Sequence, residues 1–230
     1  MSSLAQGGVD RSARAAAIER IVARYRRWRH RRYVRGKLKW DPLFDAAVPL
    51  FARSTHPLLD IGCGLGLLGQ YLHECGNRAA YFGVDPDGAK IDEARAAAMA
   101  GALGFDFATV DAASLPPFSG DVALIDVLHY LPEGLQQQAL TNAASRIAPG
   151  GTLVIRNVLR DASWRFRVTV AEERFLALLG WMRFATGHFP RREDIESPLA
   201  ALGFDVRVEP LWGGTPFNSY LIVARRARSE

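Results

Sequence analysis

Cysteine is scarce in this chain of 230 residues, where only Cys63 and Cys75 occur. Two cysteines give no framework of disulfide bonds, which suits a protein of a reducing compartment. The chain also lacks a run of 18 apolar residues, so we predict no membrane-spanning helix. Its first residues show no apolar core of a secretory signal. These absences favour a cytoplasmic protein.

Acidic residues are nearly missing from residues 11–39, where ten arginines and two lysines face Glu19 alone. The segment therefore carries +11, the whole chain +5 and all other residues together −6. An arginine-rich, acid-poor start also resembles an organelle transit peptide. Trp28, Tyr33 and Trp40 look instead like packing residues. We expect a basic helical extension over residues 1–52, followed by one domain over residues 53–230.

Hydrophobic spacing predicts the elements. Residues 12–34 have apolar positions at helical spacing, Asp41-Pro42 marks a break, and residues 43–52 form a second helix. Beyond residue 57, strands and helices alternate. The predicted strands are 57–61, 79–84, 105–109, 121–125, 151–157, 205–210 and 218–225. The predicted helices are 65–75, 87–100, 134–147, 170–183 and 192–202. This order predicts a Rossmann-like α/β fold: a doubly wound, mostly parallel seven-stranded sheet with helices on both faces.

The most informative stretch is residues 58–66, in which an apolar strand ends in Asp60 and a glycine-rich turn leads into a helix. Glycines such as Gly62 and Gly64, on either side of Cys63, let the backbone approach a ligand closely. The helix start presents free N–H groups. With a carboxylate at the strand tip, the turn suits a ligand that has a nucleoside at one end and a cationic amine at the other.

Two further acids follow the next predicted strands. Asp85 ends the second strand and precedes Pro86, and Asp111-Ala112 follows the third. A carboxylate after the second strand can accept hydrogen bonds from both ribose hydroxyls. A polar side chain after the third strand can accept from the adenine amino group. Plainer readings stay open: Asp85 as a turn former, Asp111 as a solvated acid and Cys63 as a small gap-filling residue.

This ordered series resembles the class I S-adenosylmethionine-dependent methyltransferases. The resemblance covers residues 55–160 through motifs at 60–66, 83–85, 111–112, 121–126 and 149–151. It implies S-adenosyl-L-methionine as the donor, S-adenosyl-L-homocysteine as the product, and an antiparallel seventh strand beside the fifth. It also implies four groups of donor contacts. They are Asp60, Gly62, Cys63 and Gly64 at the methionine end, Asp85 and Pro86 at the ribose, Asp111 and Ala112 at the adenine, and Asp126 and Val127 near the sulfonium.

Two other readings remain. Gly64, Gly66 and Gly69 match the G-x-G-x-x-G pattern of nicotinamide-dependent oxidoreductases, with Asp85 about 20 residues further on. Asp60 argues against that reading, because a carboxylate directly before the turn would repel a pyrophosphate. The other reading is a subunit that binds S-adenosylmethionine and serves an active partner without being active itself.

Methyl transfer to a hydroxyl needs a base, because the acceptor must lose its proton as the new bond forms. His129, after the fourth predicted strand, is the candidate catalytic base, since imidazole titrates near neutral pH. A packed histidine is the alternative. His188 is a second candidate for the acceptor site. We predict no metal, because the five histidines show no metal-ligand spacing.

The expected acceptor pocket draws on the ring-rich segment 156–190, with Tyr130, Trp164 and Arg165 as predicted contacts and Trp212 and Asn218 on the far side. The fourth strand is not followed by the Asn/Asp-Pro-Pro-Tyr/Phe signature typical of enzymes that methylate planar amino groups. This absence favours oxygen acceptors, and it also leaves carbon and small amines open.

Residues 33–42 resemble, more weakly, methyltransferases of aryl-polyene and related fatty-acid-like pigment pathways in secondary metabolism. That resemblance implies an aryl hydroxyl carried on an acidic acyl carrier protein. The arginine-rich helix also suits an anionic membrane surface, which would make the protein peripheral to the inner face of a membrane. Nucleic acid is not expected as a partner, because the rest of the chain is acidic and contains no RNA-binding module.

Overall fold

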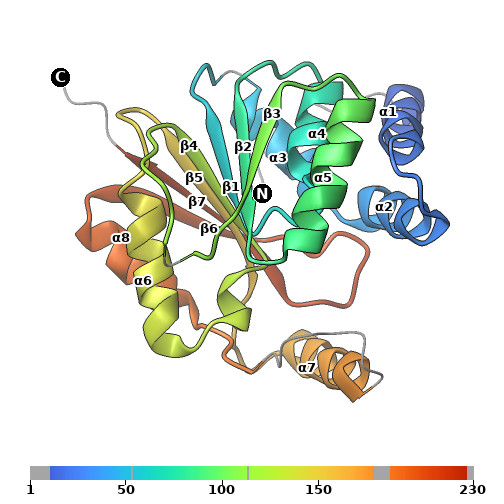
Figure 1. The fold of residues 1–230 in the computed structure, drawn as a ribbon. Helices are drawn as coiled ribbons and strands as arrows, with labels where there is room; N and C mark the ends of the chain where they lie inside the picture. The colour runs from blue at the N-terminus through green and yellow to red at the C-terminus, as the bar shows by residue number, and fades with distance from the viewer. Residues whose placement is uncertain (1–10, 53, 113, 179–186, 227–230) are drawn as a thin grey trace. The chain divides into compact units, whose positions relative to one another are not determined.

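The structure is a computed structural model that describes residues 11–52, 54–112, 114–178 and 187–226. It contains a seven-stranded sheet with the order β3-β2-β1-β4-β5-β7-β6 (Figure 1). This order confirms the predicted Rossmann-like fold. The chain divides into two compact units, residues 1–111 and 112–230. The predicted boundary after residue 52 stays a prediction.

The first unit contains three parallel strands: β1 (Leu58–Ile61), β2 (Tyr81–Asp85) and β3 (Phe105–Thr109). All four residues of β1 and four of the five in β2 are buried. Such nearly continuous apolar runs are typical of parallel strands covered on both faces. The helices α4 (Leu67–Glu74) and α5 (Gly88–Ala100) connect these strands. Asp87 begins α5 by accepting hydrogen bonds from the amides of Ala89 and Lys90.

Three helices precede β1: α1 (Arg11–Ala23), α2 (Trp28–Trp40) and α3 (Leu43–Phe51). The prediction of one helix over residues 12–34 is therefore wrong. The chain turns at residues 24–27 because Tyr25 enters the core, where its hydroxyl donates to Leu65 O at 2.9 Å. Except for Trp28, the predicted apolar stripe packs into this core with Val34 and Leu38 from α2. The prediction that Trp28, Tyr33 and Trp40 are packing residues is wrong, because all three are exposed.

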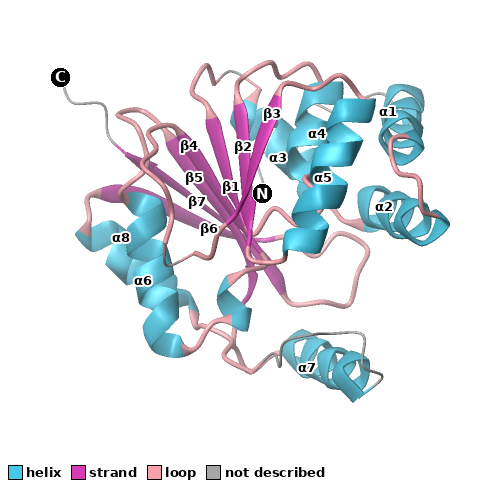
Figure 2. Ribbon diagram, in the orientation of Figure 1, coloured by secondary structure: helices cyan, strands magenta, loops and turns pink. Residues whose placement is uncertain are grey.

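The second unit contains β4 (Asp121–Ile125), β5 (Thr152–Val158), β6 (Phe204–Pro210) and β7 (Ser219–Arg226). Strands β4 and β5 are parallel, and β7 runs antiparallel to both β5 and β6. The antiparallel seventh strand beside the fifth is therefore confirmed. Figure 2 distinguishes the helices from the strands of the sheet. The helical elements of this unit are η1 (Leu128–Tyr130), α6 (Glu133–Ala144), α7 (Trp164–Leu178) and α8 (Arg192–Ala201).

Helix α7 begins six residues before the predicted start at residue 170. Ser163 Oγ accepts a hydrogen bond from the amide of Phe166 at 3.1 Å, which caps the helix there. Residues 179–183 of that prediction lie outside the described part of the chain. In the described ranges, no helix is long and apolar enough to cross a membrane.

Candidate functional site

The glycine-rich turn between β1 and α4 is held by hydrogen bonds to its neighbouring strand. The amides of Gly62 and Cys63 both donate to Val84 O, at 2.7 and 3.0 Å. Gly64 and Gly66 adopt left-handed conformations, with φ of +55° and +68°, which a residue with a Cβ atom adopts at a cost. A Cβ atom added at Gly64 would meet nothing within 4 Å. The backbone at Gly64 is therefore both fixed and open to close approach.

Asp85 joins this turn to the start of α5. Its Oδ2 accepts from the amide of Gly64 at 3.0 Å, and its Oδ1 accepts from the amide of Asp87 at 2.9 Å, across Pro86. The side chain is buried at the end of β2. A carboxylate offers about four lone-pair positions, so acceptor capacity remains for hydroxyl donors. Its predicted contact with a ribose stays a prediction.

Asp60 is buried in β1, and the hydroxyl of Tyr81 donates to its Oδ2 at 2.6 Å. Burial raises the pKa of Asp60 to about 7, the hydrogen bond from Tyr81 opposes this rise, and the charge of Asp85 adds to it. An ionised Asp60 is therefore costly unless a cation comes close. The predicted contact of Asp60 with an ammonium group would supply such a cation.

Cys63 lies beside these acids as a buried thiol. Burial raises its pKa far above the ordinary range, and the charges of Asp60 and Asp85 raise it further. A Cβ atom added at Gly83 would lie 2.8 Å from Cys63 Sγ, so the sulfur fills the space that this glycine leaves. The thiol therefore stays protonated at neutral pH, and the side chain has a packing role in this unit.

Asp111 and Ala112 follow β3, as predicted, where the amide of Val110 donates to Asp85 O at 3.2 Å. Asp111 is exposed and is the last residue of the first unit. Ala112 begins the second unit, where its carbonyl accepts from Asn142 Nδ2 at 3.2 Å. The structure thus gathers Asp60, Asp85 and the glycine turn, whereas the predicted adenine contacts of Asp111 and Ala112 stay predictions.

Asp126 follows β4 with a φ of +56°, a strained conformation for a residue other than glycine. Two contacts with β5 hold it there. Its amide donates to Arg156 O at 2.8 Å, and its carboxylate forms an ion pair with the guanidinium of the buried Arg156. Non-glycine residues in this conformation tend to occur at functional sites. Asp126 lies between the end of β4 and the start of η1, and the predicted donor contacts of Asp126 and Val127 stay predictions.

His129 is buried in η1, and its ring orientation is set by β5. Its Nδ1 lies 2.9 Å from Oδ1 of Asn157, while Nδ2 of Asn157 donates to Val158 O at 2.8 Å. Because the amide nitrogen of Asn157 donates to Val158 O, the amide oxygen faces the ring and accepts a hydrogen bond from Nδ1–H. In the neutral imidazole, Nε2 is then the basic nitrogen.

Aromatic rings surround His129. Phe189 stacks on it with centroids 5.9 Å apart and 13° between the planes, and Tyr130 packs at 4.3 Å. Phe166 meets Phe189 edge-on at 5.3 Å. His188 precedes Phe189 but is itself exposed. The structure therefore brings His129 and Tyr130 together; the roles predicted for them and for His188 stay predictions.

The guanidinium of Arg165 lies between two indole rings, 4.7 Å from the centroid of Trp164 and 4.5 Å from that of Trp212. Its Nη1 also donates to Thr215 O. These contacts join the start of α7 to the loop before β7, and they place Trp212 against Arg165, although the prediction puts Trp212 on the far side of the pocket. Whether it contacts an acceptor stays a prediction. Asn218 is buried nearby, and its Nδ2 donates to Leu159 O and to Asp161.

Sequence reasoning missed Asn157, Arg156 and Tyr81 as partners of the predicted site residues. A signal existed for two of them, because Arg156 and Asn157 follow the apolar run of residues 153–155 within a strand. Buried polar side chains normally have a specific partner. Among the residues that the structure describes, no three His, Cys, Asp or Glu side chains gather as a metal site would require. The expected independence from metal stays a prediction.

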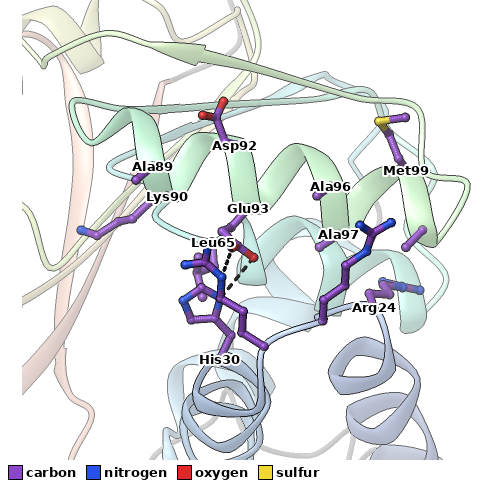
Figure 3. Close-up of a pocket in the computed structure, with 13 residues that line it drawn as sticks. Arg24, His30, Leu65, Ala89, Lys90, Asp92, Glu93, Ala96, Ala97 and Met99 are labelled. Carbon is purple, nitrogen blue, oxygen red and sulfur yellow. Dashed lines mark ion pairs between the residues drawn. The ribbon is translucent and has the colours of Figure 1, made fainter.

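A groove of about 640 Å³ runs along α5 in the first unit (Figure 3). It is lined by Leu65 of the glycine turn, by arginines and His30 from residues 24–30, and by α5 from Ala89 to Ala100. Glu93 lies 3.3 Å from Arg27 Nε and 3.1 Å from His30 Nδ1. None of the acids predicted to bind the donor lines this groove.

Comparison with known proteins identifies the family to which this chain belongs. Residues 58–151 match the family described as "Methyltransferase domain". The chain is 30% identical over 165 residues to a ubiquinone biosynthesis O-methyltransferase of Rhizobium rhizogenes, covering 67% of this chain and 64% of that protein. The chain belongs to the class I S-adenosylmethionine-dependent methyltransferases. This methyltransferase is also 28% identical over 224 residues to a protein of the same name from Rhizobium leguminosarum bv. trifolii, covering 89% and 83% of the two chains.

Solved structures of two proteins share the fold of this methyltransferase. An O-methyltransferase family protein from Burkholderia thailandensis has a TM-score of 0.67 at 22% identity, covering 96% of this chain and 61% of that one. Magnesium protoporphyrin IX methyltransferase from Synechocystis PCC 6803, with bound S-adenosylhomocysteine, has a TM-score of 0.65 at 21% identity, covering 93% and 94%.

The first unit of the methyltransferase fits the donor that its family implies. S-adenosylmethionine carries an ammonium and a sulfonium, and a cation beside Asp60 would favour the ionised form of this buried acid. The open side of Gly64 gives room for close approach to the backbone. Asp85 keeps acceptor capacity for hydroxyls. The two buried carboxylates and the open glycine turn therefore suit S-adenosylmethionine.

Proposed function

We propose that this methyltransferase transfers a methyl group from S-adenosylmethionine to a hydroxyl oxygen of a small aromatic acceptor, either free or linked to an acyl carrier. The observation that carries the proposal is the orientation of His129, whose Nδ1 faces Asn157 at 2.9 Å. The two Rhizobium relatives are named ubiquinone biosynthesis O-methyltransferase, and this name supports oxygen as the acceptor atom.

The first unit holds the donor in this proposal. Asp60 receives the ammonium, the turn at Gly64 approaches the methionine end, and Asp85 accepts from the ribose hydroxyls. When bound, S-adenosylmethionine supplies a methyl group that its sulfonium has already activated for displacement. The protein therefore has to align acceptor and methyl group and to remove one proton.

His129 takes that proton at Nε2. The hydroxyl oxygen forms its bond to the methyl carbon while the carbon–sulfur bond breaks, and the hydroxyl proton passes to the imidazole. Asn157 accepts from Nδ1–H both before and after the transfer, so the ring does not reorient. General-base catalysis of this kind contributes roughly 10²- to 10⁴-fold to a rate.

The aromatic lining of His129 supports a flat, apolar acceptor. Phe189 is fixed by Arg160, whose Nε donates to Phe189 O at 3.1 Å and whose amide donates to Pro190 O at 2.8 Å. Together with Phe166 and Tyr130, this ring makes a wall of aromatic surface around the imidazole. Aromatic groups pack favourably against such surfaces in stacked or edge-on geometry.

The test is methyl transfer to a panel of phenols and acyl-carrier-linked aryl hydroxyls, with products read by mass spectrometry. We expect the His129→Ala variant to lose about 10²-fold or more in kcat while it binds S-adenosylhomocysteine as tightly as the unmodified protein does. His73→Ala, on α4 of the first unit, is the matched control and keeps the rate. An unchanged rate in His129→Ala would refute the assignment of the base. Donor binding without turnover of any acceptor would favour the inactive partner subunit.

A further inference from the structure

Helix α2 presents an outward face made of aromatic and basic side chains. At about 100° per residue, seven positions fall within an arc of roughly 140°. They are Trp28, Arg29, Arg32, Tyr33, Gly36, Lys39 and Trp40. Three are aromatic, three are cationic, one is glycine and none is acidic.

The rings on this face are unusually open to solvent. Trp28 is 66% exposed, Tyr33 55% and Trp40 70%. A single exposed ring is ordinary, but a group of rings on one helix face points to a binding surface. Cations lie against two of them: Arg29 is 5.7 Å from the centroid of Trp28, and Lys39 Nζ is 4.8 Å from that of Trp40. The face is thus a mixed surface of rings and positive charge.

The opposite face holds the helix in place. Val34 and Leu38 are completely buried in the core of the first unit. Arg35 forms an ion pair with Glu19 at 2.6 Å, and Lys37 forms one with Asp41 at 2.8 Å. These acids are therefore engaged by cations that lie outside the outward arc. These contacts fix the orientation of α2 from the side opposite its outward face.

We propose that this face docks on an anionic lipid surface, with α2 lying in the plane of the membrane interface. Tryptophan and tyrosine favour that interface because their rings are apolar and their N–H or O–H group stays hydrated. Arginine and lysine are attracted to anionic headgroups. A helix with both features and low overall hydrophobicity binds at the interface without crossing the bilayer.

The rings favour this occupant over a soluble polyanion. An acidic carrier protein or an RNA would be attracted mainly by the charges of Arg29, Arg32 and Lys39. The three exposed rings add apolar surface that matches the boundary between headgroups and acyl chains. At the centre of the face, a Cβ atom added at Gly36 would meet nothing within 4 Å, so the backbone there approaches any flat surface closely. This inference is independent of the reaction proposed above.

The test is co-sedimentation of the full chain with phosphatidylcholine vesicles that contain increasing amounts of phosphatidylglycerol. We expect binding to rise with the anionic fraction and to weaken as salt is added, since salt screens the charges. Replacing Arg29, Arg32 and Lys39 together by glutamine lowers partitioning by roughly 100-fold, at about fivefold for each cation. The double variant Trp28→Ala and Trp40→Ala also lowers it, although every charge is kept.

Gly36 offers a matched pair of variants in which no existing side chain is lost. Gly36→Lys and Gly36→Glu both point into open space, so both fold. Lysine strengthens vesicle binding and glutamate weakens it, with roughly 20-fold or more between the two. Met99→Ala, at an apolar side chain that is 80% exposed on α5, is the control and leaves binding unchanged.

Three results would overturn the proposal. The first is equal binding to neutral and anionic vesicles. The second is vesicle binding that the ring and Gly36 variants do not change. The third is weak vesicle binding combined with tight, charge-dependent binding of an acidic acyl carrier protein or RNA to the same face, which would assign the face to a soluble partner instead.

Discussion

Asn157 Oδ1 lies 2.9 Å from Nδ1 of His129, and this contact determines which ring nitrogen carries the proton. Asn157 is completely buried, and its amide nitrogen is committed to Val158 O. A buried histidine needs a partner for its ring N–H in any role, so this contact fixes the tautomer, and kinetics test whether Nε2 acts as the base. The pairing gives the proposed base both its orientation and the chemical state in which Nε2 can accept a proton.

The first prediction concerns this pair. Asn157→Asp places a carboxylate against Nδ1, which stabilises the protonated ring. The acid limb of the kcat/KM profile should therefore move to higher pH. Asn157→Leu removes the oxygen and should lower kcat by about tenfold or more with little change in KM, because the ring loses its orientation. Steady-state kinetics across pH measure both effects; an unmoved profile in both variants would show that Asn157 does not act through His129.

The second prediction concerns Asp60, whose folded pKa of about 7 lies above its ordinary value of 3.8. Folding thus favours the protonated form, and the stability that this proton provides is lost as pH rises from about 4 through 7. Asp60→Asn keeps an acceptor for Tyr81 and removes the ionisation. The variant should be more stable than the unmodified protein at pH 8, by up to about 4 kcal/mol, with little difference near pH 4.

Donor binding should change in the opposite direction. Without a carboxylate at residue 60, the affinity for S-adenosylhomocysteine should fall by about tenfold or more, although the fold is more stable. Thermal melts at several pH values and calorimetric titrations measure the two effects separately. Asp106→Asn, at an exposed acid on β3, is the matched control and should alter neither quantity. A variant that binds as well as the unmodified protein would exclude Asp60 from the ammonium site.

The sequence predicts most of the sheet, but it does not predict contacts between residues that lie far apart in the chain. The strand positions follow from apolar runs and local turn residues, whereas the antiparallel seventh strand follows from the family resemblance, and the structure confirms both. The break between α1 and α2 cannot be predicted in this way, because Tyr25 turns inward to reach Leu65, which lies 40 residues further along the chain. A helical stripe carries no information about such a distant acceptor.

The same limit applies to the site. Asp60, Asp85 and the glycines follow strand ends and are visible in the sequence. The contact between His129 and Asn157 joins residues 28 positions apart and depends on the register of β4 against β5. The strained φ of Asp126 likewise depends on its contacts with Arg156 in β5. Local pattern reveals the residues but not these pairings.

The third prediction separates two glycines of the turn. Gly64→Ala costs about 1–2 kcal/mol of stability because φ is +55°, yet its methyl group meets no atom of the protein. Its main effect should be on the donor, with affinity for S-adenosylhomocysteine about tenfold or more weaker. Gly66→Ala should destabilise more, because its Cβ would lie 2.9 Å from the ring of Phe107.

Melting temperature and calorimetry compare the two glycine variants directly. We expect Gly66→Ala to have the lower melting temperature of the two. We expect Gly64→Ala to lose more affinity for S-adenosylhomocysteine than its loss of stability explains. Normal donor binding by Gly64→Ala would contradict a close approach of the ligand to that backbone.

The fourth prediction concerns metal. Methyl transfer should proceed unchanged after the protein is treated with EDTA and the chelator is removed by gel filtration, because His129 and not a metal-bound hydroxide removes the proton. The measurement is the initial rate before and after treatment, with magnesium or zinc added back. A rate that falls on chelation and returns with one of these ions would require a metal in the acceptor site.

The most direct test of the account follows the methyl group itself. The protein is incubated with S-adenosylmethionine carrying a ¹³C-labelled methyl group and with the phenol panel or a cell extract, and the labelled products are examined by NMR and mass spectrometry. The account predicts one methoxy carbon in the product, formed by the unmodified protein and lost in His129→Ala. A label on nitrogen or carbon, or a methoxy product that forms equally well without His129, would contradict it.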